Sequence, residues 1–214
     1  MAYNLGLWIG ALDVIARLGD ALEPLLAREA AALALLARIE VEAKLTAGPA
    51  YADYATETFI EDHLSLDSLT LLRNDAVPEG RALTALEAVR ITLESRANRA
   101  QPWGDWGMIC AYPPFKRRRD LRAKTAFAFR YHNGADWPYL SGLYGLERLR
   151  RGLPGWRYPL TRWWRTSLEN GWAGAVEYFS PPFGRGSLLQ GWSAMPAAAV
   201  MAHASTVLAG DPEA

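Results

Sequence analysis

The spacing of apolar residues predicts a chain built mainly from helices. Side chains such as Leu5, Trp8 and Leu12 recur about every 3.6 residues, the repeat that places them on one face of a helix. Glycines and prolines divide this pattern into separate segments. The predicted helices cover residues 4–19, 21–46, 66–76, 78–97, 137–151, 156–170 and 190–208.

Individual residues mark the ends of several predicted helices. Ser65 is placed to cap the third helix, and Pro78 fits the first turn of the fourth. Asp136 would cap the fifth helix if the segment before it is an ordinary helix start. Gly152 and Gly171 follow the fifth and sixth helices, where a glycine commonly ends a helix. The helices are expected to pair as antiparallel neighbours, and such pairs can stack or close into a ring.

Two long stretches between the helices lack a helical period. Residues 101–135 and residues 172–187 are irregular, and Gly107–Tyr112 is their one convincing β-strand. Residues 50–63 predict a third loop with a short strand. Long irregular segments inside a compact domain usually carry function. We therefore predict an all-α fold with long loops and one or two short strands, and a functional site in the loops.

Composition narrows the classes of protein to which the chain can belong. Half of its 214 residues are hydrophobic, enough for the packed core of one domain. Basic and acidic residues both number 23, which argues against nucleic acid or an anionic membrane as a partner. Cys110 is the only cysteine, and no apolar run resembles a signal peptide or a membrane span. We therefore expect a cytoplasmic protein without disulfides.

The segment YHNGADWP, residues 131–138, combines an aromatic face with hydrogen-bonding groups. It lies in the part of the chain beyond residue 100, which holds eight of the nine tryptophans. Sugars need both kinds of group, because a sugar ring carries hydroxyls at its rim and C–H groups on its faces. His132 and Asn133 offer directional hydrogen bonds, and Trp137 offers the flat face. Gly134 permits a turn with positive φ. The alternative is an ordinary helix start capped by an aspartate, and both interpretations can hold together.

Glu177 is the carboxylate that its surroundings single out. It lies in the apolar and aromatic segment AVEYF, residues 175–179, which is followed by the rigid Ser180-Pro181-Pro182. Burial beside aromatic groups raises the pKa of a carboxyl group and suits it to general acid or base catalysis. The alternative is a glutamate at a strand edge that is exposed or paired with an arginine.

The remaining polar candidates are weaker. Asp67 lies near His63 at a predicted helix start. It is either a site residue or, with at least equal weight, a helix cap. The three histidines, His63, His132 and His203, show no metal-ligand spacing. The chain also has no glycine-rich phosphate loop, so we expect neither a metal nor a cofactor.

Three segments together resemble glycoside hydrolases with an (α/α)6-toroid catalytic domain. The segment at residues 131–138 is similar to their YHNGxxWP signature, and Trp172 with Val176–Phe179 looks like their W-x-E-Y-Y segment. Gly191-Trp192-Ser193 matches their Q-x-W-S segment, with Gln190 and Gly191 directly before Trp192. The enzymes most similar in these motifs are glycogen-debranching amylo-α-1,6-glucosidases, trehalase-like and mannosylglycerate hydrolase-like enzymes, and neutral invertases. The resemblance covers roughly residues 55–210.

The resemblance implies hydrolysis of α-glucosidic or related bonds with inversion at the anomeric carbon. Glu177 stands at the position of the general base. From the resemblance and the residue pattern together, the residues expected to contact an oligosaccharide or disaccharide are His132, Asn133, Asp136, Trp137, Trp192, Trp103, Trp106 and Asp67. Trp103 and Trp106 lie in a loop that would form a subsite wall.

The chain departs from the family pattern in one respect. The general acid of the family is an aspartate upstream of the YHNG segment, and no segment here matches it. An inverting glycosidase needs a second carboxyl group about 6.5–9.5 Å from the first. Asp67, Asp105 and Asp136 are the available substitutes.

A complete toroid has twelve helices, and this chain supplies about two thirds of them. The fold expected for residues 1–214 is therefore a single domain, the C-terminal portion of a toroid of stacked antiparallel helix hairpins. The open edge of a partial toroid would be covered by self-association or by a partner.

Two other functions remain open. A truncated, non-catalytic carbohydrate-binding protein would keep the aromatic pocket and lack the acid. A sugar epimerase on a related toroid would use paired histidines as proton carriers, for which only the three histidines are available.

Overall fold

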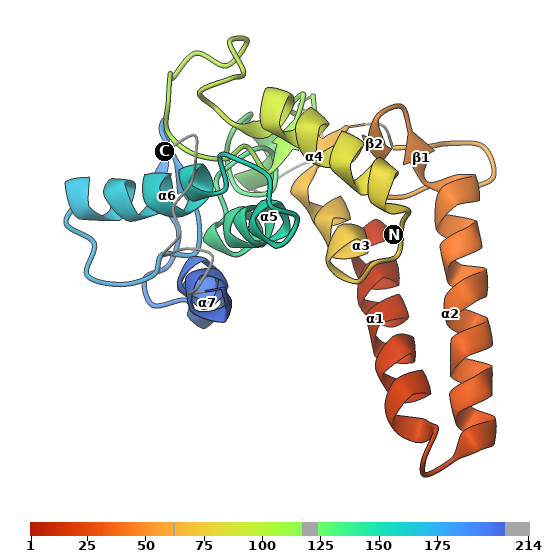
Figure 1. The fold of residues 1–214 in the computed structure, drawn as a ribbon. Helices are drawn as coiled ribbons and strands as arrows, with labels where there is room; N and C mark the ends of the chain where they lie inside the picture. The colour runs from red at the N-terminus through yellow and green to blue at the C-terminus, as the bar shows by residue number, and fades with distance from the viewer. Residues whose placement is uncertain (62, 117–123, 204–214) are drawn as a thin grey trace. The chain divides into compact units, whose positions relative to one another are not determined.

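The described residues, 1–61, 63–116 and 124–203 of the computed structural model, form seven α-helices and three pairs of two-residue strands (Figure 1). The prediction of a mainly helical chain with few, short strands is therefore confirmed. The chain packs into two compact units. Unit 1 contains Met1–His63 and Asp67–Glu87, and unit 2 contains Leu64–Leu66 and Ala88–Ala214. That residues 1–214 form one domain stays a prediction.

The helices of unit 1 are α1 (Ala2–Gly19), α2 (Pro24–Lys44) and α3 (Leu69–Arg73). The first two form a long antiparallel hairpin, and α3 packs on α1 (Figure 1). A glycine makes this packing close, because a Cβ at Gly6 would lie only 2.5 Å from the carbonyl carbon of Thr70. Arg38 of α2 donates hydrogen bonds of 3.2 and 2.6 Å to the Asp13 carboxylate of α1, which ties the hairpin together.

The predicted helix over 66–76 is shorter than its pattern suggested. A 3₁₀ turn, η1 (Leu66–Ser68), leads into α3, and Ser68 rather than Ser65 stands at the helix N-cap. The prediction for Ser65 is wrong because its backbone pairs with Ala111 in a two-stranded sheet. The short strands of unit 1 are β1 (Thr46–Ala47) and β2 (Ala50–Tyr51). Helix α4 (Glu79–Leu93) follows α3 in the chain and contributes residues to both units.

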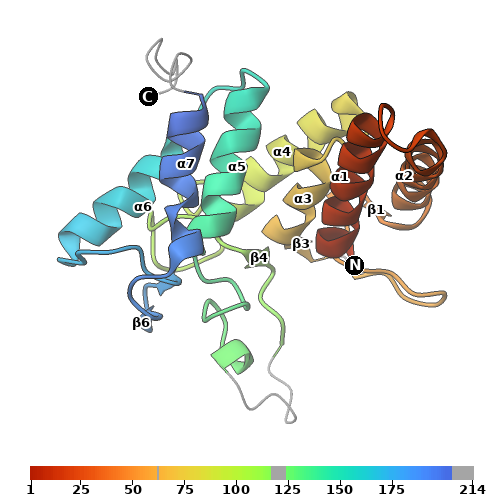
Figure 2. The same ribbon diagram turned by 90° about the horizontal axis from the view of Figure 1, so that it is seen from below.

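The helices of unit 2 that follow α4 are α5 (Pro138–Arg150), α6 (Arg157–Glu169) and α7 (Met195–Ala202). Helix α5 is buried along most of its length and contacts both α6 and α7 (Figure 2). Two glycines of α5 allow these contacts. A Cβ at Gly142 would lie 2.7 Å from the Pro196 nitrogen of α7, and one at Gly145 would lie 3.0 Å from Leu160 of α6.

The irregular stretches of unit 2 contain short strands. Strand β3 (Leu64–Ser65) pairs with β4 (Ala111–Tyr112), and β5 (Phe179–Ser180) pairs with β6 (Gly184–Arg185), both antiparallel. The turns η2 (Lys124–Ala126) and η3 (Gly191–Ala194) are 3₁₀ helices. The turn η3 occupies the start of the predicted helix over 190–208, whose last residues lie outside the described part of the chain.

The strand predicted at Gly107–Tyr112 is regular only at its last two residues. The preceding backbone is bonded to other segments, because Ile109 N donates to Leu93 O at 2.7 Å and Cys110 N donates to Ala135 O at 3.2 Å. A run that changes partner at each residue does not form a continuous sheet. The side chain of Cys110 is buried, as expected for a small core residue.

None of the helices in the described ranges combines the length and the apolar character needed to cross a membrane.

Candidate functional site

Two segments that are far apart in the sequence lie side by side in unit 2. Asp136 N donates to Phe179 O and Phe179 N donates to Asp136 O, both at 2.8 Å. This backbone pair places the YHNGADWP segment next to the AVEYF segment. The structure therefore brings Glu177 and the 131–138 segment into one neighbourhood.

Four rings from these segments form what we call the Trp137 cluster: Tyr131, His132, Trp137 and Tyr178. His132 stacks flat on Trp137, with ring centroids 4.6 Å apart and planes 3° apart. Tyr178 meets Trp137 at 5.4 Å, and Tyr131 approaches it edge-on at 5.0 Å. Trp137 and Tyr178 are buried, whereas His132 is exposed. A ligand reaching this cluster would therefore meet His132 first.

The backbone before Trp137 folds into a tight loop. Phe129 N donates to Asn133 O at 2.6 Å, and Tyr131 and Gly134 both have positive φ, +53° and +105°. The expectation of a positive φ at Gly134 is thus confirmed. A Cβ there would come within 3.2 Å of Ala111 O, so glycine also satisfies a close approach between backbones.

Asn133 is buried beneath this loop and uses its amide to hold other backbone segments. Its Oδ1 accepts a hydrogen bond from Phe115 N at 2.7 Å. Its Nδ2 donates to Phe115 O at 3.1 Å and to Thr125 O at 2.9 Å. Both amide protons and the carbonyl oxygen are occupied, so Asn133 positions the loop that carries His132.

Glu177 is half-buried and belongs to the edge of the β5–β6 hairpin. Its Oε2 accepts a hydrogen bond from Ser187 N at 3.1 Å, and its own N–H donates to Ser187 O at 2.8 Å. Gly186 leaves room for the carboxylate, because a Cβ there would lie 2.6 Å from Oε2. One oxygen is thus oriented by the backbone, while the side chain stays partly open to solvent.

Asp136 is the deeply buried carboxyl group of this neighbourhood. Its Oδ2 accepts a hydrogen bond from Met108 N at 3.0 Å, and its Oδ1 is bonded to the Ser141 hydroxyl. Burial raises the pKa of Asp136 to about 7, although these two hydrogen bonds and the charge of Arg162 act to lower it. Gly107 makes the arrangement possible, since a Cβ there would lie 2.0 Å from Oδ2.

The prediction that Asp136 caps the fifth helix is wrong. The residue at the N-cap of α5 is Trp137, with no side-chain hydrogen bond to the helix end. The Asp136 carboxyl group turns instead toward the Gly107–Met108 backbone and the Ser141 hydroxyl. The proline at the first turn removes one N–H that a cap would otherwise satisfy.

Trp103 and Trp106 lie in a line of aromatic contacts. Trp103 meets Phe129 at 4.9 Å, and Phe129 and Phe179 each meet Trp106 at 6.4 Å. Trp172 continues the line, 5.5 Å from Phe179. Trp106 is buried and its indole N–H donates to the Gln101 side chain at 3.0 Å, whereas Trp103 is 39% exposed. Trp103 therefore offers the open aromatic surface, and Trp106 supports it.

Two expected site residues lie apart from these contacts. Trp192 is in η3 and is 55% exposed. Asp67 belongs to unit 1, where its carbonyl oxygen accepts a hydrogen bond from the Thr70 hydroxyl at 3.0 Å. In the same unit, the His63 ring pairs with the Glu61 carboxylate.

Unit 2 contains a buried polar network that the sequence pattern did not predict. Glu94 is 1% exposed, accepts a hydrogen bond from the Tyr144 hydroxyl at 2.8 Å and pairs with Arg96 at 2.7 Å. The Tyr158 hydroxyl donates to Asp105 at 2.7 Å. Burial raises the pKa of both tyrosines, so both hydroxyls stay protonated as donors. A lone glutamate at the end of a helical pattern gives no sign of this role.

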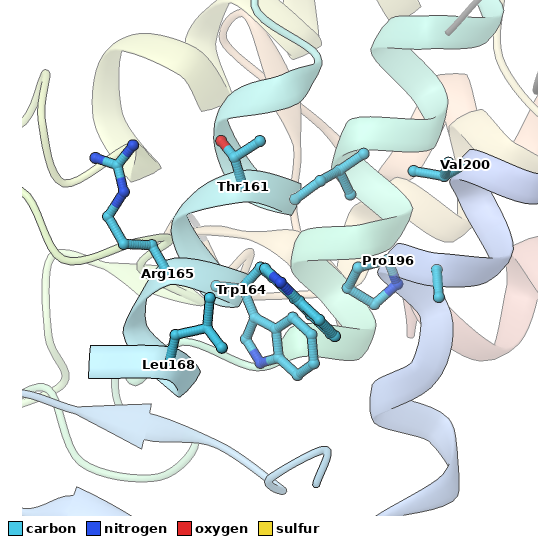
Figure 3. A pocket seen from close by; sticks show the side chains of 9 residues that line it. Thr161, Trp164, Arg165, Leu168, Pro196 and Val200 are labelled. Atoms are coloured by element: carbon cyan, nitrogen blue, oxygen red, sulfur yellow. The ribbon is translucent and has the colours of Figure 1, made fainter. Parts of the chain in front are cut away.

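Helix α6 borders two adjoining cavities. One, of about 430 Å³, lies between α6 and α7, with Trp164 and Leu168 on one side and Pro196 and Val200 on the other (Figure 3). The other, of about 400 Å³, is bounded by α6, residues 172–175 and the start of α7. Neither cavity includes Glu177 or a member of the Trp137 cluster in its lining.

Within the described ranges, no three histidine, cysteine, aspartate or glutamate side chains are grouped so that they could hold a metal ion.

No protein-family model matches this chain, and no curated protein is significantly similar to it. The resemblance to toroid glycoside hydrolases therefore rests on the three sequence segments alone.

Proposed function

We propose that this chain is the C-terminal portion of an inverting glycoside hydrolase domain of the (α/α)6-toroid class, acting on α-glucosidic or related bonds of an oligosaccharide or disaccharide. The observation that carries the proposal is the backbone pair between Asp136 and Phe179. It joins the two segments with the strongest resemblance, although nothing in their spacing along the chain requires them to meet.

Glu177 is the general base in this proposal. Its Oε2 is oriented by Ser187 N, and its partial exposure lets water reach the carboxylate. The carboxylate takes a proton from a water molecule as the water oxygen attacks the anomeric carbon. The glycosidic bond breaks on the opposite face, and its oxygen leaves with a proton from a general acid.

The other residues of the neighbourhood divide into contact and support. His132 is exposed and can hydrogen-bond a sugar hydroxyl, and Trp103 presents an open indole. Trp137 stacks on the His132 ring, and Asn133 bonds the loop to Phe115. Asp136 accepts a hydrogen bond from Met108 N, which anchors the same loop. We assign Trp192 to the outer part of the site by resemblance alone.

The general acid comes, in this proposal, from a segment outside residues 1–214. Asp136 has both oxygens bonded within the core and is 2% exposed, so it cannot reach a leaving group. Asp105 Oδ1 accepts a hydrogen bond from the Tyr158 hydroxyl and lies 3.8 Å from Arg162 Nε. Both contacts involve Asp105 Oδ1, so this carboxylate is already engaged within unit 2.

The partial toroid is part of the same proposal. The burial of α5 between α6 and α7 supports it, because the inner helices of a toroid are covered by their neighbours. Self-association, or a partner that completes the ring, would cover the remaining apolar edge. A cytoplasmic location also belongs to the proposal.

The test is hydrolysis of α-D-glucosyl fluoride, whose fluoride leaves without a proton from a general acid, by the wild type, Glu177→Gln and Glu169→Gln. Glu169 is an exposed glutamate at the end of α6 and serves as the matched control. We expect Glu177→Gln to lower turnover by about 10²–10⁴-fold, the usual effect of losing a general base, and Glu169→Gln to leave it unchanged. Equal activity of the two variants would refute the role of Glu177.

A non-catalytic carbohydrate-binding protein is the second candidate. One observation favours it: Asp105 and Asp136 are both committed to contacts within unit 2. Sugar binding measured by calorimetry without turnover of α-D-glucosyl fluoride would favour this function over hydrolysis.

A further inference from the structure

We propose that the cavity between α6, residues 172–175 and the start of α7 is a second carbohydrate site, which holds one neutral pyranose ring. We call it the α6 cavity. The choice of a sugar over another neutral ring rests on the proposed function, whereas the existence of the site rests on the observations below.

The walls of the α6 cavity are aromatic and carry no charge. Three indoles, Trp163, Trp164 and Trp172, border it together with Leu168 and small residues of the 172–175 loop and α7. Indole faces pack well against the C–H faces of a sugar ring. The volume of about 400 Å³ falls within the roughly 300–1,000 Å³ of small-molecule sites. Because no acidic, basic or histidine side chain lines the cavity, it suits a neutral ligand.

Two buried polar groups of the lining have no hydrogen-bond partner among the described residues. They are the indole nitrogen of Trp163, which is 7% exposed, and the hydroxyl of Ser167, which is 5% exposed. The two residues are four apart on α6, so they share one face of the helix. Buried donors and hydroxyls are nearly always bonded in proteins, and a ligand at this position would supply the missing partners.

Ser167 also departs from the usual behaviour of a helical hydroxyl. Thr161, on the same helix, donates to the carbonyl oxygen of Arg157 one turn earlier at 2.9 Å. The Ser167 hydroxyl makes no such bond. The backbone carbonyl oxygen of Ser167 accepts a hydrogen bond from Trp172 N at 2.9 Å. The Ser167 hydroxyl, on a residue that lines the cavity, therefore has no partner among the described residues. A donor from Trp163 and a hydroxyl from Ser167 match the rim of a sugar, where each hydroxyl both donates and accepts.

The α6 cavity is distinct from the neighbourhood of Glu177. Its loop wall ends at Ala175, whose carbonyl oxygen accepts Gln190 N at 2.9 Å. Trp172 links the two regions, because it lines the cavity and its ring also contacts Phe179, with the centroids 5.5 Å apart. Occupation of the α6 cavity would therefore hold a sugar beside the catalytic region without using Glu177.

The experiment follows the indole N–H signals of ¹⁵N-tryptophan-labelled protein by NMR during titration with methyl α-D-glucopyranoside and methyl α-D-mannopyranoside. Trp163→Phe identifies the Trp163 signal. We expect that signal to move and to saturate with at least one of the two sugars. Ser167→Ala should weaken the binding about fivefold to tenfold, the usual effect of one lost hydrogen bond. Thr161→Val removes an exposed hydroxyl of α6 that is outside the cavity and should leave the binding unchanged.

A signal of Trp163 that does not respond to either sugar would overturn the proposal, as would a response to cyclohexanol alone. Equal weakening by Ser167→Ala and Thr161→Val would do the same. The titration is repeated with Glu177→Gln, which should bind like the wild type. Saturable binding without any Glu177-dependent hydrolysis would overturn the proposed hydrolase and keep the α6 cavity. Hydrolysis without a Trp163 response would do the reverse.

Discussion

The imidazole of His132 lies flat on the indole of Trp137, with 4.6 Å between the ring centroids and 3° between the planes. The exposed ring of His132 thus covers the buried ring of Trp137. Stacked aromatic pairs are worth about 0.5–1.5 kcal/mol beyond the area that they bury. We infer that this contact fixes the position of the imidazole before any ligand arrives.

Removing the imidazole should therefore cost stability as well as sugar contact. His132→Ala is predicted to lower the free energy of unfolding by about 1 kcal/mol, measured by urea denaturation. His132→Phe keeps a flat ring on Trp137 and should retain most of the stability while losing the hydrogen bond to sugar. The account of the stack would be wrong if the two variants were equally destabilised.

The buried Asp136 carboxyl group should make the stability of the fold depend on pH. Its pKa is raised from 3.8 to about 7 in the folded chain, so the folded state binds the proton more tightly than the unfolded state does. The stabilising effect of that proton is fully present below about pH 4 and is lost as the pH rises through about 7. Since each pKa unit is worth about 1.4 kcal/mol, the loss amounts to a few kcal/mol.

Asp136→Asn tests this dependence, because the amide keeps the shape and cannot ionise. The difference in unfolding free energy between the variant and the wild type should grow in favour of the variant from about pH 4 to about pH 7. Taking the difference removes the contribution of the other titrating groups. A difference that stays constant over this range would show that Asp136 titrates normally.

Gly107 should be essential for the burial of Asp136. A Cβ at this position would lie 2.0 Å from the Asp136 carboxylate, and its φ of +139° is unfavourable for any other residue. Gly107→Ala should therefore cost about 3 kcal/mol or more in urea unfolding. Gly104→Ala is the matched control, because its φ of +68° is also positive but its Cβ would meet nothing within 4 Å. Its cost should be only about 1–2 kcal/mol, and equal costs would contradict the proposed clash.

The helices of this fold were largely predictable from the sequence, because each depends on a local repeat. The patterns over 137–151 and 156–170 correspond closely to α5 and α6. The capping predictions for Ser65 and Asp136 were wrong because both residues bond to distant segments instead. Ser65 pairs with Ala111, and the Asp136 carboxyl group bonds to Met108 and Ser141.

The sequence named the segments of the candidate site but not their contacts. The resemblance predicts that residues 131–138 and Glu177 share a site, and the structure pairs the two segments through the backbones of Asp136 and Phe179. The inward turn of Asn133 toward Phe115 and Thr125 depends on segments that no local pattern connects to it. The α6 cavity was missed for the same reason, because its walls come from α6, a loop and α7.

Asn133 gives a prediction about the loop that carries His132. Asn133→Ala removes the acceptor for Phe115 N and the donor to Phe115 O and Thr125 O. Hydrogen exchange of the Phe115 amide should become at least about tenfold faster, as expected for one lost hydrogen bond. Asn133→Asp keeps the acceptor and should protect that amide better than Asn133→Ala does. Unchanged exchange in Asn133→Ala would mean that the amide does not hold the loop.

The central claim is that this chain belongs to an inverting glycoside hydrolase with Glu177 as its base. The most direct test is to follow hydrolysis of α-D-glucosyl fluoride by ¹H NMR before the released glucose can mutarotate, because fluoride leaves without a general acid. The account predicts that the β-anomer is released first and that Glu177→Gln slows its appearance by about 10²–10⁴-fold. Release of the α-anomer first, hydrolysis by Glu177→Gln at the wild-type rate, or no hydrolysis of α-D-glucosyl fluoride would contradict it.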